Sequence, residues 1–224
     1  MNATVALPAR APLALGRPLA RAAGWTAIGA LTALLVVNTL PYFADADAMP
    51  FFEEKGPLPD DPIWRAAFFV HITGGMACLV AVLPLFSKRL LAARPAVHRA
   101  LGWAYVASVL LLVVPTGLFL SPTARGQTAG PAGFMVIGLS LLVCTAMGLR
   151  HVLRRDFVAH RAWMVRSYAM AATALSFRVV FVVLSRIPVA RAYEISVWLS
   201  WGIAALVAEA WIERSRTRTR RTTA

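Results

Sequence analysis

The chain has 224 residues, of which 59% are hydrophobic and only 15% are charged, and its mean hydropathy is +0.66. Soluble domains are nearer to half apolar and a quarter charged, so the composition indicates an integral membrane protein built as one bundle. A net charge of +13 would suggest nucleic-acid binding in a soluble protein, but in a membrane protein it reports topology. No nucleic-acid partner is therefore predicted.

Six apolar segments follow one another, each near the roughly 20 residues that a bilayer requires. They cover residues 21–43, 63–86, 100–120, 131–149, 163–184 and 195–212. We predict an all-α, polytopic bundle of six transmembrane helices over residues 21–213, between a loose amino-terminal arm (1–20) and a basic tail (214–224). The first segment is longer than the roughly 7–15 residues of a signal-peptide core, so we expect it to be retained.

The distribution of arginine and lysine predicts the orientation of the bundle. The arm, the second loop, the fourth loop and the tail are basic, whereas the first loop carries six acidic residues and one lysine. Both termini are therefore predicted to be cytoplasmic, in a multi-pass protein of the cytoplasmic membrane. The lipid bilayer is the predicted partner, and the sequence leaves the oligomeric state open.

An outer layer of polar residues is predicted from helix rise alone. His71 lies roughly 12 Å and Arg178 roughly 9 Å from the outer boundary, and Asn38 is at a similar height. Because a charge inside the membrane needs a partner, we expect His71 and Arg178 to share a site between the second and fifth helices. A water-filled or anion-binding cavity and a simple set of hydrogen bonds to Asn38 and the backbone both remain open.

An inner layer of polar residues is predicted near the cytoplasmic face. Arg166 and Glu209 share a height there, and we expect them to form an ion pair between the fifth and sixth helices. Two His-Arg pairs, His98-Arg99 and His160-Arg161, complete the layer, because each pair opens a helix that rises from the cytoplasmic side.

The histidines raise the possibility of b-type haem, which requires ligands at matched height on facing helices. His98 and His160 meet the height condition and are the candidate haem ligands, although a histidine at the interface also serves as a helix cap or headgroup contact. His71 has no histidine partner in the outer half, so a two-haem arrangement is not predicted. Cys78 and Cys144 lie in apolar segments and are predicted to pack there, and no metal is assigned.

The chain resembles a bacterial family of predicted multi-pass membrane proteins of unknown function. The resemblance runs from about Ile63 to Glu209 and is carried by short segments. These are His71 with Gly75, His98-Arg99-Ala-Leu-Gly102-Trp-Ala-Tyr105, His160-Arg161-Ala-Trp163-Met164-Val-Arg166-Ser167-Tyr168, Arg178, and Trp198-Leu-Ser-Trp201 with Glu209. It implies the six-helix fold.

Three functions compete at this level. The first is a membrane redox protein that binds b-type haem or quinone near His98 and His160. The second is a transporter for a small solute or anion that uses His71 and Arg178, and the third is a lipid-binding scaffold without a cofactor. The sequence contains no nucleophile–base pair, phosphate loop or carboxylate dyad, so an enzyme of the hydrolase class is not predicted.

Overall fold

The computed structural model describes residues 16–223, and this part of the chain is helical without a strand. Six helical stretches in it are long and apolar enough to cross a membrane, so the predicted fold with six spans is confirmed. They are Ala22–Ala44, Pro62–Leu85, Pro95–Thr123, Ala129–Leu153, Phe157–Leu184 and Ala192–Thr217.

Several spans consist of more than one helical element. In chain order the elements are α1 (Gly16–Thr39), α2 (Pro41–Ala44), α3 (Pro50–Lys55), η1 (Leu58–Asp60), α4 (Pro62–Leu85), α5 (Lys88–Ala93), α6 (Pro95–Ala107), η2 (Ser108–Val113), α7 (Val114–Leu120), η3 (Ser121–Thr123), α8 (Ala129–Leu153), α9 (Phe157–Ala171), α10 (Thr173–Leu184) and α11 (Ala192–Thr223).

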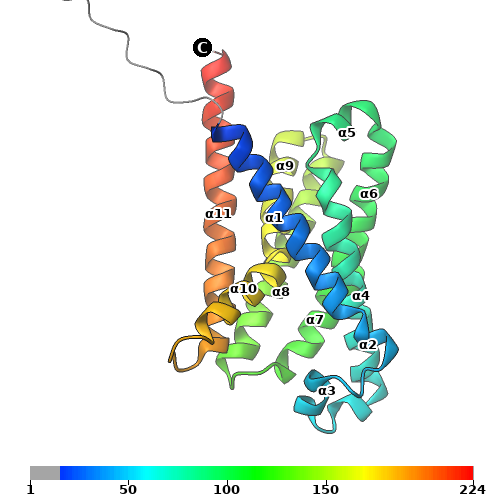
Figure 1. The fold of residues 1–224 in the computed structure, drawn as a ribbon. Coiled ribbons are helices and arrows are strands. Elements are labelled where there is room, and N and C mark those ends of the chain that lie inside the picture. Colours follow the sequence, from blue (N-terminus) through cyan, green and yellow to red (C-terminus); the bar gives the residue numbers. More distant parts are fainter. Residues whose placement is uncertain (1–15, 224) are drawn as a thin grey trace, which may run out of the picture.

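The spans stand side by side, and α1 crosses the face of the others obliquely (Figure 1). The start of α1, the helix α5, the start of α9 and the end of α11 all lie at one end of the bundle. We call this the inner end, because the sequence predicts that it is cytoplasmic. The opposite, outer end carries α2 and α3.

The helices that carry the two His-Arg pairs begin earlier than the sequence analysis predicted. α6 begins at Pro95 rather than residue 100, and α9 begins at Phe157 rather than residue 163. Pro95 suits the first helical position because its missing N–H is not needed there. Asp156 caps α9, since its side chain accepts a hydrogen bond from the Ala159 N–H at 3.0 Å.

The third and fifth spans are interrupted. In the third span the π-helical stretch η2 leads directly into Pro115, which supplies no N–H and clashes with the preceding turn of an α-helix. Carbonyl groups of this stretch are bonded by side chains instead, because Thr116 donates to Leu112 O. In the fifth span Ala172 separates α9 from α10.

The core of the bundle lies between the spans at mid-height. Tyr105 and Val109 are fully buried there, and Cys78 is buried in the same cluster. Neither Cys78 nor Cys144 is in a disulfide, which agrees with their predicted packing role.

At the outer end the connection between the first two spans packs onto α4. Phe52 and Trp64 are buried, and the rings of Trp64 and Phe68 stack 5.7 Å apart. Arg65 forms a two-pronged ion pair with Asp47 at 2.7 and 3.0 Å, so the acidic loop neutralises the arginine at the start of α4.

The predicted terminal segments are partly helical. α1 begins at Gly16, inside the predicted arm, and α11 continues through the basic tail to Thr223. The remainder of the predicted arm, residues 1–15, lies outside the described residues. The division into arm, membrane domain and tail remains a prediction.

Candidate functional site

The early starts of α6 and α9 place His98 and His160 in the first turns of two helices rather than in the loops before them. Both helices begin at the inner end and run toward the outer end (Figure 1). Asp156 holds the first turn of α9 and is itself close to His151, whose Nδ1 lies 3.1 Å from Asp156 Oδ2. The hydrogen bond from the Ala159 N–H, and then the one with His151, hold the pKa of the Asp156 carboxyl below its ordinary value.

One hydrogen bond fixes the register between α6 and α9. The hydroxyl oxygens of Tyr105 and Ser167 lie 2.7 Å apart, and the two residues are 62 positions apart in the sequence. His98 and His160 are separated by the same 62 positions, each seven residues before its partner in this bond. Since both helices rise about 1.5 Å per residue in the same direction, the two histidines are at the same height. Their imidazoles are near enough to influence each other electrostatically.

The imidazole of His160 is oriented by the backbone of α8. Its Nδ1 lies 2.8 Å from the carbonyl oxygen of Gly148, and because a carbonyl only accepts, Nδ1 must carry the proton. The lone pair of Nε2 is therefore available to a ligand. A Cβ at Gly148 would lie 2.5 Å from Met164 Sδ, so the glycine lets this methionine side chain pack closely against α8.

The surroundings of His98 are less complete. Its Nδ1 is shielded from solvent and has no hydrogen-bond partner in the described part of the chain. Gly102, one turn further along α6, occupies the level of Met164 on α9, again 62 positions apart. A Cβ added at Gly102 would meet nothing within 4 Å. Gly102 is itself partly exposed, so the space beside it is open to the surroundings of α6.

A directed chain of hydroxyl groups closes the site on the side of the membrane centre. Thr145 on α8 donates to the carbonyl oxygen of Leu141 at 2.7 Å, which uses its one hydrogen. Ser167, whose hydroxyl lies 2.7 Å from that of Thr145, must then donate to Thr145, and Tyr105 must donate to Ser167. All three side chains are fully buried, so the chain joins α6, α9 and α8 in a single direction.

The predicted ion pair of Arg166 and Glu209 is present. Arg166 Nε lies 2.5 Å from Glu209 Oε1, and the second contact is 2.8 Å, which is the two-pronged geometry that favours arginine. The Trp163 ring lies 4.8 Å from the guanidinium carbon. Arg166 is nine residues into α9 rather than one turn inside a helix, so the pair joins α9 to α11 well above the first turn.

The two arginines of the His-Arg pairs lie at the surface of the inner end. Arg161 is exposed and its guanidinium carbon is 5.1 Å from the centre of the Trp211 ring, which adds a second link between α9 and α11. Arg99 is exposed on α6.

The residues of the predicted outer layer have separate surroundings in the structure. His71 Nδ1 lies 3.0 Å from the carbonyl oxygen of Val113 and 3.3 Å from Thr116 Oγ1, and its ring fills the space left by Gly117. The imidazole therefore bonds to the π-helical stretch and the turn that follows it.

Arg178 lies on another helix, and its Nη1 donates to the Ala174 carbonyl at 2.6 Å, one turn nearer the inner end. The phenol groups of Tyr42 and Tyr193 are its nearest ionisable neighbours among the described residues. Asn38 is exposed at the outer end of α1. No interaction between His71, Arg178 and Asn38 is found among the described residues, and their common site remains a prediction.

The chain Tyr105–Ser167–Thr145 and the open space at Gly102 are the parts of the inner site that the sequence analysis missed. Both were accessible in principle. A hydroxyl-bearing residue follows each histidine at the seventh position, and seven residues bring a helix back to nearly the same face. The equal spacing of His98 to Tyr105 and of His160 to Ser167 indicates that the two helices share a register.

Comparison with known proteins assigns the chain to a family. The model of one family, described as "Predicted membrane protein (DUF2306)", matches residues 68–212, which include every segment of the inner site. No curated protein and no solved structure matches the chain. The match covers more than half of the chain, and the protein therefore belongs to the DUF2306 family of predicted membrane proteins.

Proposed function

We propose that this bundle is a membrane redox protein that holds a planar prosthetic group of the b-type haem class between His98 and His160. The observation that supports the proposal most directly is the common offset of 62 residues, which brings two imidazoles to one height on facing helices. Axial ligation of haem by two histidines requires that arrangement.

The polar atoms around the two imidazoles fit such a group. Histidines that bind a metal through one nitrogen usually donate the other N–H to a carbonyl or carboxylate, and the His160–Gly148 hydrogen bond has this form. His98 has a buried nitrogen without a protein partner, and Gly102 leaves room beside it. When bound, haem supplies one-electron chemistry at a potential that its axial ligands and surroundings set.

The residues of the chain have distinct parts in this proposal. The carbonyl of Gly148 fixes the orientation of the His160 ring. The hydroxyl chain closes the site toward the membrane centre. Arg99 and Arg161, each directly after a histidine, place positive charge at the inner end, where it complements anionic substituents of the group.

The absorption spectrum of the full-length protein tests the proposal. Protein purified from haem-sufficient cells is expected to show a Soret band and, after reduction, an α band. His98→Ala and His160→Ala should each reduce haem content at unchanged protein yield. His151→Ala is the matched control and should keep the spectrum, because His151 bonds to Asp156 and not to the facing helix.

A colourless wild-type protein ends the haem proposal. If that protein instead carries a quinone that both histidine variants lose, the redox function stands with a different ligand. Retention of the full spectrum by both variants would move the haem elsewhere and reject the site.

Anion transport is the second candidate, and Arg178 is the observation that favours it. The guanidinium lies within a membrane span and bonds to a backbone carbonyl. None of the ion pairs found among the described residues includes Arg178. Uptake of anions such as chloride or phosphate into proteoliposomes should then require Arg178 and fall in Arg178→Gln. Equal uptake by protein-free liposomes and by both proteins would reject this candidate.

We also infer that both termini face the cytoplasm and that the bundle lies in the cytoplasmic membrane, from the excess of arginine at the inner end. Reporter fusions after Pro57 and after Arg125 are expected to be external. A cytoplasmic signal from either fusion contradicts this orientation.

A further inference from the structure

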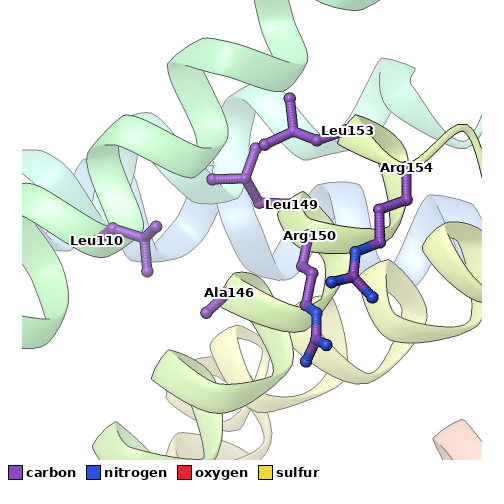
Figure 2. A pocket seen from close by; sticks show the side chains of 6 residues that line it. All are labelled: Leu110, Ala146, Leu149, Arg150, Leu153 and Arg154. Carbon is purple, nitrogen blue, oxygen red and sulfur yellow. The ribbon is translucent and has the colours of Figure 1, made fainter.

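A shallow groove of about 370 Å³ lies on the side of the bundle, outside the histidine site, between α8 and η2. Four of its residues lie on α8, Arg154 follows directly after that helix, and Leu110 lies on η2 (Figure 2). Those on α8 are Ala146, Leu149, Arg150 and Leu153. The groove therefore belongs to a surface that faces the bilayer at the inner end of a span.

Its lining separates into an apolar part and a basic part. Leu110, Leu149 and Leu153 form the apolar part together with Ala146, whereas Arg150 and Arg154 extend in a common direction beside it (Figure 2). Arg150 lies in the last turn of α8 and Arg154 caps that helix four residues later, so the two arginines lie on the same side of its end.

The arginines are not neutralised by the protein. All ten acidic residues of the chain lie in the described part, and the ion pairs that they form involve Arg65, Arg125, His151 and Arg166. Arg150 and Arg154 thus present two unpaired guanidinium groups at the edge of the groove. Their position at the inner end of the span is where the headgroups of the inner leaflet are expected.

We propose that this groove binds one anionic phospholipid of the inner leaflet, with its phosphate on Arg150 and Arg154 and an acyl chain along Leu110, Ala146 and Leu149. Guanidinium groups bind phosphate through paired hydrogen bonds, which accounts for the basic part. A soluble anion would leave the apolar part unused, and a neutral lipid would leave two charges uncompensated. A molecule that joins an anionic headgroup to an aliphatic chain satisfies both parts.

The proposal is tested by titrating the full-length protein in detergent with phosphatidylglycerol or phosphatidylcholine. Native mass spectrometry measures how much lipid binds. The wild type should bind one phosphatidylglycerol in preference to phosphatidylcholine. Each arginine removed should weaken phosphatidylglycerol binding roughly 5-fold, so Arg150→Gln with Arg154→Gln should remove most of the preference. Arg89→Gln with Arg94→Gln is the matched control, since it removes equal charge from the inner end, away from the groove.

The apolar part has its own test. Ala146 is exposed in the groove, so Ala146→Phe should obstruct the acyl chain and weaken binding while both arginines remain. Val207→Phe enlarges an equally exposed apolar side chain on α11 and should leave binding unchanged. Thermal unfolding provides a check on folding, and bound phosphatidylglycerol should raise the melting temperature of the wild type.

Two results would overturn the proposal. One is equal phosphatidylglycerol binding by the wild type and the Arg150→Gln, Arg154→Gln variant. The other is stabilisation of the wild type by inorganic phosphate to the same extent as by phosphatidylglycerol, which would make the arginines a simple anion site.

Discussion

Two contacts in the inner half of this bundle join side chains on different helices, whereas His71 and Arg178 in the outer half bond to backbone carbonyl groups. Arg166 reaches Glu209 on α11, and Tyr105 reaches Ser167 on α9. His71 bonds to the carbonyl of Val113, and Arg178 to a carbonyl of its own helix.

The difference shows that two residues at the same depth in the membrane need not be in contact. A side-chain pair fixes the rotation and the register of both helices, because each partner has to point at the other. A bond to a backbone carbonyl satisfies a polar group wherever a helix passes. The Tyr105–Ser167 and Arg166–Glu209 contacts therefore specify how their helices pack, and the carbonyl bonds of His71 and Arg178 do so to a smaller extent.

The largest expected effect comes from breaking the hydroxyl chain at its middle. Ser167→Ala removes two hydrogen bonds and leaves the Tyr105 O–H without an acceptor in a buried place, so we expect a loss of roughly 1–3 kcal/mol in the free energy of unfolding. Tyr105→Phe removes the first donor only and should cost about 0.6 kcal/mol, the usual value for such bonds between membrane helices. Unfolding in mixed micelles measures both.

Ser200→Ala is the control for this comparison. Ser200 is fully buried, as Ser167 is, but its hydroxyl has no hydrogen-bond partner among the described residues. Its loss should therefore leave stability nearly unchanged. An equal effect of Ser167→Ala and Ser200→Ala would show that the chain contributes nothing.

The ion pair of the inner half gives the next effect. Glu209→Gln should lower stability by up to about 1 kcal/mol, because the Glu209 side chain is 57% exposed and solvent or headgroups screen the pair. In a double-mutant cycle with Arg166→Gln, most of this loss should appear as a coupling energy between the two residues. Additive effects of the two substitutions would mean that the contact has no coupling energy.

Arg178 should respond in the opposite sense to Arg166. Arg178→Leu removes a charge that has no carboxylate partner from a membrane span, so we expect a small gain in thermal stability, whereas Arg166→Leu should destabilise the protein. The two melting temperatures in one detergent decide this. Destabilisation by Arg178→Leu would instead indicate that the arginine holds an anion in the folded protein.

The smallest effect concerns the first turn of α9. The pKa of Asp156 is lowered in the folded protein, so its carboxylate contributes stability above the ordinary value of 3.8. That contribution is lost as pH falls below this value through the lower pKa of the folded state. Exchange of the Ala159 amide hydrogen should accelerate over the same range, and in Asp156→Asn it should not depend on pH there.

Hydropathy and helix rise were sufficient for part of this structure. Six spans are long enough to be recognised from apolar length alone, and the pairing of Arg166 with Glu209 followed from a common height. The common site of His71 and Arg178 stays a prediction, because a common height does not state which neighbour a helix face meets.

The predicted starts of α6 and α9 were wrong. Apolar length was used to place them, although Pro95 and Asp156 are signals of a helix start. The π-helical stretch before Pro115 could not be predicted from composition, because a helix can adjust to the missing N–H of a proline in several ways.

The one-way order of the hydroxyl chain also affects the movement of protons through the bundle. Proton conduction along hydroxyl groups requires a group at the far end that releases a proton, followed by reversal of every bond. Here the last acceptor is the helical carbonyl of Leu141, which cannot pass a proton on. The chain that joins α6, α8 and α9 therefore offers protons no route through its own hydroxyl groups.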